Sequence, residues 1–278
     1  MNAIQNPTKD HHYVPVCYLK QFLNTQTRKV ATLNVGNMRL KYPVKLKWYS
    51  PRQFCYIKDY YTISDELKKE FKDFNVYDAL YIESELFGRL ENSFHTLMDL
   101  LIKKRSLPAT QALHVADLII QIKLRNPYMA DLNEKHSPGW MDEIYPGLEK
   151  QFLADSRFMA YSEEIKKIIL QKSMQKTRES PLLKKRLQLF SLIQRNTQGS
   201  QANFRIRQAM LATNWVLLTV SGTSRFITTD NPGFAVDENS LHNIKLKGFY
   251  RFYFPLSPKH CLMFGDGTDL KYIKKRKI

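Results

Sequence analysis

Two adjacent histidines, His11 and His12, stand near the start of the chain and are followed by Tyr13-Val14-Pro15. Imidazole titrates near neutral pH, so either side chain could transfer a proton, bind a metal or contact a phosphate. Proline favours the first turn of a helix and holds the residue before it extended, so we expect an extended arm leading into a short helix. Neighbouring residues of an extended chain point to opposite faces, so both rarely bind one metal. The alternative is a structural histidine bonded to the backbone.

A second group of chemically active residues is the run Thr228-Thr229-Asp230-Asn231-Pro232. Asp230 follows an apolar stretch and precedes a turn, which is a common way to hold a carboxylate toward a cleft. This placement indicates a general base or a metal ligand. Asp230 and His12 would then be the ligands of a divalent ion, Mg²⁺ or Mn²⁺. The alternative is an Asx-turn, in which Asp230 or Asn231 binds nearby backbone N–H groups.

A third group is formed by Gln121 and Arg125, which lie four positions apart on one face of an expected helix. A guanidinium there could grip a phosphate with two hydrogen bonds. The alternative is a buried ion pair with Asp117 or Glu91. If a metal needs a second carboxylate, the candidates are Glu83 and Glu91 on the preceding helix. A charged flank of that helix is the alternative explanation for them.

These three groups define one candidate site. The expected catalytic residues are His11, His12, Arg125 and Asp230. The residues expected to support the site are Tyr13, Gln121, Thr229 and Asn231.

The charge of the chain points to a polyanionic partner. The 278 residues hold 43 Lys and Arg against 26 Asp and Glu, which gives a net charge of +17 and a pI of about 9.7. This charge exceeds the magnitude of roughly 2–8 that is usual for a small domain. Nucleic acid, a nucleotide or an anionic membrane surface is therefore the expected partner, and generic solubility charge is the alternative. The expected nucleic-acid contacts are Lys20, Lys172, Lys176, Lys184, Lys185, Arg186, Lys274, Lys275 and Arg276.

Several enzyme classes lack their motifs here. No Walker loop, GxGxxG, GxSxG or HExxH occurs. This argues against ATPases, dinucleotide oxidoreductases, serine hydrolases and common zinc proteases.

The elements that must position the site follow from the hydrophobic pattern. Apolar or alternating runs predict strands at residues 28–35, 41–48, 53–57, 215–220, 225–228, 249–254 and 260–264. Helical periodicity predicts helices at residues 77–106, 108–125, 148–175, 181–195 and 201–211, with a loop around Pro138-Gly139 and Pro146-Gly147.

The order of these elements predicts an α+β fold. We expect a single domain over residues 1–278 whose terminal strands share a sheet, with a helical insertion at roughly residues 77–212. A shared sheet would bring the two histidines close to Asp230. Residues 271–278 form a basic C-terminal tail in the sequence.

The compartment is expected to be the cytoplasm. The first ten residues are polar and lack the apolar stretch of a secretory signal, and no apolar run approaches the length of a membrane span. The three cysteines are far apart and odd in number, so we expect neither a disulfide framework nor a zinc knuckle.

Four runs of the sequence also carry a family resemblance. His11 to Pro15 with the following YLKQF, residues 121–127 (QIKLRNP), residues 226–232 (FITTDNP) and residues 254–258 (FPLSP) occur in the order of the DUF4238 family. Thr229 stands where serine is more frequent, and it keeps the hydroxyl. The resemblance spans nearly the whole chain and implies a common fold and site. The family is functionally uncharacterised, so the resemblance implies no activity.

The residues therefore predict a protein that acts on nucleic acid. The first hypothesis is a nuclease, with His11 or His12 as acid/base or metal ligand, Asp230 orienting a histidine or binding Mg²⁺, and Arg125 stabilising the charge on phosphorus. The second is a non-catalytic RNA- or DNA-binding module. The third is a nucleotide sensor with a pocket between the histidine arm and the TTDNP turn. A role in bacterial host defence would suit a nuclease.

Overall fold

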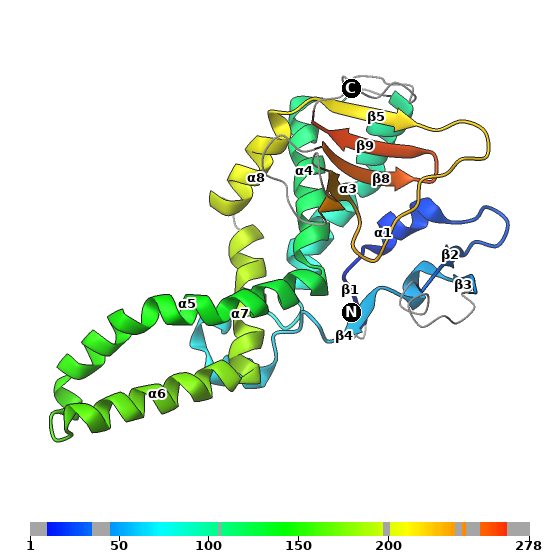
Figure 1. The fold of residues 1–278 in the computed structure, drawn as a ribbon. Helices are drawn as coiled ribbons and strands as arrows, with labels where there is room; N and C mark the ends of the chain where they lie inside the picture. The colour runs from blue at the N-terminus through cyan, green and yellow to red at the C-terminus, as the bar shows by residue number, and fades with distance from the viewer. Residues whose placement is uncertain are drawn as a thin grey trace.

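The computed structural model describes residues 10–34, 45–104, 107–196, 201–236, 241–242 and 251–265. Small sheets lie at both ends of the chain and helices occupy its centre, so the predicted α+β class is confirmed. Figure 1 shows the C-terminal sheet, the N-terminal strands and a long helical arm that reaches away from both.

The N-terminal part consists of two short ribbons. Strand β1 (Asp10–His12) pairs antiparallel with β4 (Tyr56–Lys58), and β2 (Val30–Thr32) pairs antiparallel with β3 (Lys47–Tyr49). The predicted short helix after the histidine arm is present as α1 (Val16–Leu19), but it begins one residue later than predicted, because Pro15 is extended and lies at the N-cap. The short 3-10 helices η1 (Lys20–Phe22) and η3 (Pro51–Gln53) complete this region. The strand predicted at 28–35 is present but shorter, and the one predicted at 53–57 is displaced to residues 56–58, since residue 53 ends a 3-10 helix. Of the one predicted at 41–48, residues 41–44 lie outside the described part.

The helical block begins with three short segments and continues into regular helices. These elements are α2 (Asp65–Glu70), η4 (Lys72–Phe74), the π-helical segment η5 (Ile82–Phe87), α3 (Gly88–Met98), the π-helical segment η6 (Asp99–Lys104), α4 (Ala109–Leu124), α5 (Pro127–Ala154), η7 (Ser156–Phe158), α6 (Glu163–Glu179), α7 (Pro181–Asn196) and α8 (Gln201–Leu211).

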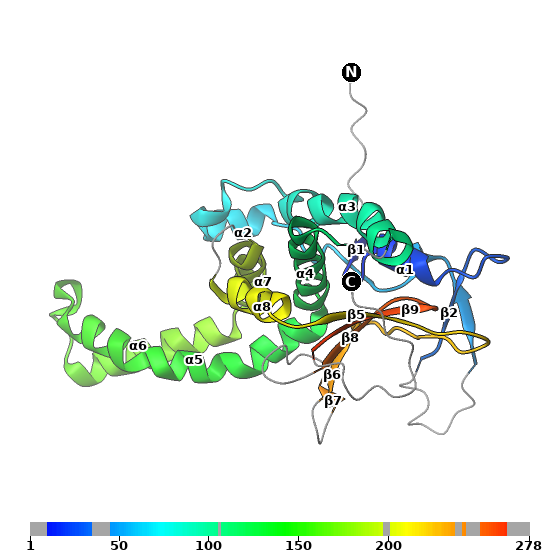
Figure 2. The same cartoon turned by 90° about the horizontal axis from the view of Figure 1, so that it is seen from above.

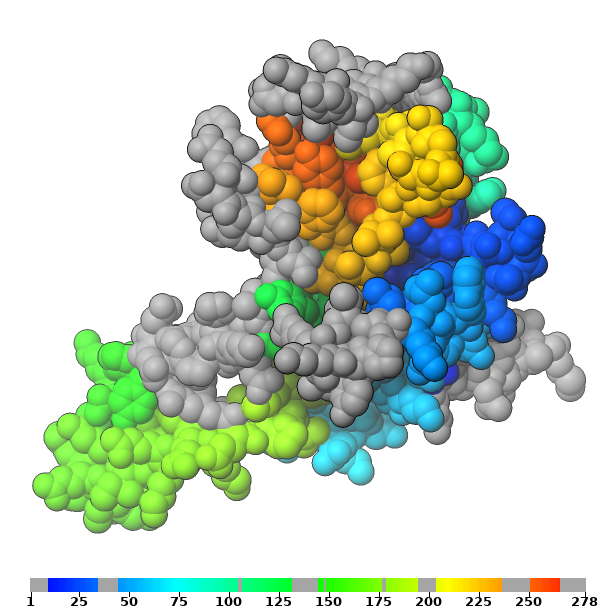
Figure 3. Space-filling model, turned by 45° about the vertical axis from the view of Figure 1, so that its right-hand side comes forward, coloured from blue at the N-terminus to red at the C-terminus, as the bar shows by residue number. Residues whose placement is uncertain are grey.

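The predicted loop around Pro138 and Pro146 is wrong, because both prolines lie inside α5. A proline removes one backbone hydrogen bond of a helix but does not forbid it. Here α6 packs along α5, and this pairing outweighs the local signal for a turn. The two helices form the arm seen in Figure 1, and the space-filling view shows α6 far from the strands of the C-terminal sheet (Figure 3). None of the described helices is long and apolar enough to cross a membrane.

The C-terminal sheet has five antiparallel strands in the order β5-β9-β8-β6-β7. Their bounds are β5 (Trp215–Thr219), β6 (Phe234–Val236), β7 (Leu241–His242), β8 (Arg251–Ser257) and β9 (His260–Phe264). The prediction that the terminal strands share a sheet is wrong, because β1 pairs locally with β4 and reaches no C-terminal strand. Residues 225–228 are likewise not a strand. Residues 249–250 and the basic tail lie outside the described part.

Two apolar clusters hold these parts together. The larger one joins α1, α3, α4 and α8 to one face of the C-terminal sheet, with Tyr18, Leu97, Ile119 and Phe254 at its centre. Figure 2 shows α3 and α4 over that face. The second cluster joins the segment at Tyr61 to α2, η4, η5 and α7. The sequence motifs lie where the two clusters meet, since Leu124 packs against both.

Candidate functional site

The QIKLRNP segment at the end of α4 links the other motifs. Its first residue, Gln121, is buried and donates a hydrogen bond from Nε2 to the backbone oxygen of Leu86, at 3.3 Å. Leu86 belongs to η5, where a π-helix disturbs the usual backbone pairing. Gln121 thus contributes to holding η5 in place, and η5 carries Glu83.

Arg125 connects this segment to the histidine arm and to α3. Arg125 is buried, with 2% of the residue exposed, and its guanidinium forms an ion pair with Glu91, with Nη1 and Oε1 2.8 Å apart. Nε donates to the backbone oxygen of Tyr13 at 3.2 Å, and the group lies over the ring of Phe87. The hydroxyl of Tyr61 donates to the backbone oxygen of Arg125. The ion-pair alternative with Glu91 is therefore the observed arrangement, and the guanidinium faces protein rather than solvent.

His11 is fully buried. Its Nδ1 accepts a hydrogen bond from the backbone N–H of Tyr61 at 2.8 Å, and its ring stacks on the ring of the same tyrosine. Burial lowers the pKa of His11, so the neutral imidazole is favoured. The bond to Nδ1 is that of a structural histidine, while Nε2, which carries the proton, is buried without a hydrogen-bond partner among the described residues.

His12 points to the other face, as the extended arm predicts, and is only half-buried. Its Nε2 lies 3.3 Å from the backbone oxygen of Arg52, and its ring lies against Tyr56. Burial lowers the pKa of His12, and Arg125 also lowers it, while Glu91 acts in the opposite direction. His12 therefore lies in the field of the Arg125–Glu91 pair and keeps contact with solvent.

The TTDNP turn is held by the same segment of α4. Lys123 is buried and donates to Oδ1 of Asn231 at 2.8 Å and to the backbone oxygen of Gly233 at 2.6 Å. Asn126 donates from Nδ2 to the backbone oxygen of Asp230. Burial lowers the pKa of Lys123 to about 7. Sequence reasoning missed Lys123 and Asn126, although a lysine between the apolar residues of a buried helix was an available signal.

Within the turn, Thr229 makes the local hydrogen bonds that an Asx-turn would have made. The backbone N–H of Asn231 donates to Oγ1 of Thr229 at 3.1 Å, and this hydroxyl donates to the backbone oxygen of Asn231 at 2.9 Å. The side chain of Asp230 is therefore not needed for these hydrogen bonds of the turn, and the residue is exposed. It lies close enough to Tyr13 and Cys55 for its charge to raise the pKa of both groups, although burial is the larger cause.

Cys55 is another residue that the motifs did not reveal. It adopts a left-handed backbone conformation with φ of 58°, which is uncommon for a residue with a side chain. Its backbone oxygen accepts from the N–H of Tyr13 at 3.0 Å, which extends the β1–β4 pairing by one step. Burial raises the pKa of the Cys55 thiol to about 12, so it is not an activated nucleophile.

Glu83 is a carboxyl group whose pKa is shifted toward neutrality. Burial raises the pKa of Glu83 to about 7, Arg125 opposes this rise, and Glu91 adds to it. Its Oε2 atom is buried and has no hydrogen-bond partner among the described residues. A carboxyl group with a pKa near neutrality can act as a general acid or base. Glu83 and Glu91 thus lie beside Arg125. The sequence had suggested them only as candidates for the second carboxylate of a metal site.

The expected metal pair is not part of a larger ligand set. In the part of the chain that the structure describes, no group of three or more His, Cys, Asp or Glu side chains could hold a metal ion. The exposed carboxylate of Asp230 could still bind Mg²⁺ together with a substrate phosphate, since Mg²⁺ often takes only one or two protein carboxylates.

The structure thus brings His12, Tyr13, Arg125 and Asp230 into one neighbourhood through the backbone contacts of α4, and it turns His11 inward. A family model for proteins of unknown function, DUF4238, matches residues 10–276. The chain belongs to the DUF4238 family. No curated protein and no solved structure matches it.

The predicted nucleic-acid contacts of this DUF4238 protein divide into exposed and internal residues. Exposed side chains are Lys20 on η1, Lys172 and Lys176 on α6, and Lys184 on α7. Lys185 instead donates to the backbone oxygen of Tyr60, and Arg186 pairs with Asp73 at 3.0 Å and lies over Phe71. Lys274, Lys275 and Arg276 lie outside the described residues.

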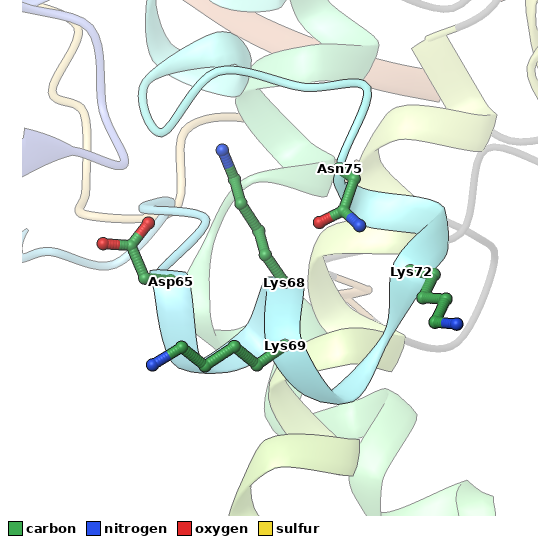
Figure 4. Close-up of a pocket in the computed structure, with 5 residues that line it drawn as sticks. All are labelled: Asp65, Lys68, Lys69, Lys72 and Asn75. Carbon is green, nitrogen blue, oxygen red and sulfur yellow. The ribbon is translucent and has the colours of Figure 1, made fainter.

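A basic hollow lies beside α7, at a distance in sequence from every motif. It has a volume of about 420 Å³ and is lined by Asp65, Lys68, Lys69, Lys72 and Asn75. In the view of Figure 4, Lys68 extends between Asp65 and Asn75, and Lys72 points to the other side. Figure 2 shows α2 next to α7, and the ion pair of Asp73 with Arg186 fixes this contact. Sequence reasoning missed this hollow, because DELKKEFKDFN has the ordinary composition of a solvated helix.

Proposed function

We propose that this DUF4238 protein binds nucleic acid through a basic surface formed by Lys68, Lys69 and Lys72 next to α7, named the α2–α7 surface below. The observation that carries the proposal is the hollow, in which three lysines of one short segment line a concave surface. Phosphate groups are the usual counterions of such a surface, and a net charge of +17 favours the same partner.

The internal contacts of α7 hold the segments that carry these lysines. Lys185 and Arg186 fasten α7 to the segments before and after α2, through Tyr60 and Asp73. Lys184 on α7 and Lys172 and Lys176 on α6 are exposed but do not line the hollow. They add to the positive charge of the protein.

The experiment that tests this proposal is a charge reversal with a matched control. The test variant carries Lys68→Glu, Lys69→Glu and Lys72→Glu. The control carries the same change at three exposed lysines elsewhere, Lys29, Lys104 and Lys150. Both variants have the same net charge, so they differ only in the place of the new carboxylates. Binding of fluorescently labelled oligonucleotides is measured by anisotropy.

We expect the test variant to lose at least tenfold in affinity. Each lysine that no longer contacts a phosphate also no longer releases the counterions of that phosphate, and this release favours binding. The control is expected to lose much less. Equal losses in the two variants would mean that net charge alone attracts the oligonucleotide, and the α2–α7 surface would not be the interface.

Phosphodiester hydrolysis is a second candidate, and Glu83 is the observation that favours it. The Glu83 carboxyl has a pKa of about 7 and lies beside Arg125. His12 has access to solvent, and the charges of Arg125 and Glu91 act on it as they act on Glu83. In this hypothesis Glu83 and His12 exchange protons with the reacting oxygens. Asp230 binds Mg²⁺ or Mn²⁺ with the substrate phosphate. Arg125 acts by holding Glu91 and the histidine arm rather than by gripping a phosphate.

This candidate is tested by nuclease assays on three single-residue variants. Glu83→Gln, Asp230→Asn and His12→Ala should each abolish cleavage while the fold persists, and cleavage should depend on added Mg²⁺ or Mn²⁺. Glu85→Gln is the control, because Glu85 is exposed and lies two positions from Glu83 in the same π-helical segment. Full activity of Asp230→Asn would remove its carboxylate from the chemistry, and the binding function would then stand alone.

The proposed place of action is a reducing compartment such as the cytoplasm. Cys17, Cys55 and Cys261 are all free. Unpaired cysteines are usual where glutathione and thioredoxin keep thiols reduced.

A further inference from the structure

The hollow contains two groups that phosphate attraction does not explain. Besides Lys68, Lys69 and Lys72, it is lined by the carboxylate of Asp65 and the amide of Asn75. A carboxylate repels phosphate, so a surface that only follows a phosphate backbone gains nothing from Asp65. A ligand that presents hydroxyl groups next to its phosphates would use all five side chains, because carboxylates and amides accept hydrogen bonds from hydroxyls.

The structure of α2 does not require Asp65 at this position. Oγ of Ser64 already caps the helix by accepting from the backbone N–H of Leu67 at 3.2 Å. Glu66, also in the first turn, supplies the negative charge that stabilises a helix start, and it does not line the hollow. Asp65 and Glu66 thus have the same local role, but only Asp65 lines the hollow together with the lysines.

We propose that this hollow binds the sugar-phosphate backbone of single-stranded RNA and selects it over DNA. The inference rests on the proposed nucleic-acid binding and names the substrate class of that same surface. The lysines take the phosphates. Asp65 accepts a hydrogen bond from the ribose 2′-hydroxyl, and Asn75 can accept from or donate to it. The 2′-hydroxyl is the group by which a protein distinguishes RNA from DNA at a given site.

The hollow is small. Its volume of about 420 Å³ falls in the lower part of the range for small-ligand pockets, which suits a short segment of backbone. Val76, next to Asn75 in sequence, is 80% exposed. It offers an apolar contact to an unstacked base, and unstacked bases occur in single strands and loops.

The test compares matched RNA and DNA strands of one sequence, about 12 nucleotides long. Binding to the wild-type protein is measured by fluorescence anisotropy at constant salt. We expect the RNA to bind about tenfold more tightly, which is the effect of one hydrogen bond to a charged group. Asp65→Ala should bring the ratio of the two affinities close to one, with DNA affinity unchanged or raised because a repulsive charge is gone. Glu66→Ala is the matched control and should leave the ratio unchanged.

The lysine variants separate the two roles. Lys68→Ala should weaken RNA and DNA by the same factor, since phosphates are common to both. If Asp65→Ala disturbs folding, as seen in its circular dichroism or melting temperature, Asn75→Ala replaces it and should lower the same ratio.

Three results would overturn the inference. Equal wild-type affinities for RNA and DNA would remove the RNA selectivity and leave the proposed nucleic-acid binding intact. The RNA selectivity would also be wrong if Asp65→Ala strengthened the binding of RNA and of DNA by the same factor. The Asp65 carboxylate would then only repel phosphate. Binding to neither strand would overturn the proposed function as well.

Discussion

Arg125 and Glu91 form an ion pair in which the side chain of Arg125 is 1% exposed and that of Glu91 29%, with 2.8 Å between Nη1 and Oε1. This one contact ties α3 to the end of α4. Through Nε of Arg125 and the backbone oxygen of Tyr13, it also fixes the histidine arm. Two of the sequence motifs therefore meet at one side chain, and the third is attached next to it through Asn126 and Asp230.

Removing Arg125 should destabilise the protein strongly. Arg125→Ala leaves Glu91 partly buried without its partner, and breaking a buried pair in this way typically costs about 3–5 kcal/mol. Because Glu91 is partly exposed, we expect about 3 kcal/mol in the free energy of unfolding by urea. The control is Arg89→Ala, whose exposed pair with Glu85 should contribute less than about 1 kcal/mol. Similar small losses in both variants would mean that the buried pair is not formed in solution.

Glu83 should give the stability a measurable pH dependence. Its pKa rises from 4.5 in the unfolded chain to about 7 in the folded protein. The folded state then binds the proton more tightly. Its contribution to stability is complete below pH 4.5 and is lost as the pH rises through 7.

The variant Glu83→Gln should therefore match the wild type near pH 5 and exceed its stability near pH 8 by on the order of 1–3 kcal/mol. Urea unfolding at a series of pH values measures this difference, with Glu85→Gln as the exposed control. Parallel stability curves for wild type and Glu83→Gln would show that the Glu83 carboxyl is ionised in the folded protein at neutral pH.

Two glycines allow steric and backbone effects to be separated. Gly233 follows the TTDNP turn with φ of +81°, and a Cβ there would approach Cζ of Phe252 to 2.7 Å and Cδ2 of Phe254 to 2.8 Å. Gly222 has φ of +64° with nothing within 4 Å of such a Cβ.

Gly222→Ala should lower stability by only about 1 kcal/mol through backbone strain. Gly233→Ala should lower it by a further 1–3 kcal/mol or so, because the core behind the turn must shift. Melting temperatures of the two variants give the comparison. Equal values would place the TTDNP turn away from the aromatic residues of β8.

The long periodic helix gives a test of core packing. The sequence predicts Leu90 and Leu97 as core residues, and Leu97 is fully buried while Leu90 is only partly buried. Leu97→Ala should cost about 2–5 kcal/mol in the free energy of unfolding, and Leu90→Ala distinctly less. A larger loss at Leu90 than at Leu97 would mean that α3 is rotated about its axis.

The regular parts of the fold were accessible from sequence, because burial imposes a period. The helices around Leu97, Ile119 and Leu189 and the strands at Leu217 and Leu262 all follow from apolar spacing. Contacts between distant segments carry no such signal. Pro138 and Pro146, both inside α5, predicted a loop, and the pairing of α5 with α6 decided otherwise. From sequence alone, the three-residue strand β1 could have paired with β4 or with the C-terminal sheet. The hydrogen bond from the N–H of Tyr13 to the backbone oxygen of Cys55 continues its pairing with β4.

The candidate site was predicted in part for the same reason. Motif residues were found because their types and spacing are chemically unusual, and the Glu91 partner of Arg125 was among the alternatives. The buried position of His11 was not accessible, since adjacent histidines look alike until the fold assigns them to two faces. Lys123 and Asn126 donate hydrogen bonds to the TTDNP turn, more than a hundred residues away, and such contacts leave no local pattern.

The measurement that tests the central claim most directly is the salt dependence of oligonucleotide binding. Dissociation constants for a single strand are measured between about 50 and 200 mM salt, for the wild type and for the variant with Lys68, Lys69 and Lys72 changed to alanine. The logarithm of the affinity should fall linearly with the logarithm of the salt concentration. The slope should become less steep by about 2 in the variant, at roughly 0.7 for each lost phosphate contact. No binding at low salt, or the same slope in both proteins, would contradict the assignment of the α2–α7 surface as the nucleic-acid interface.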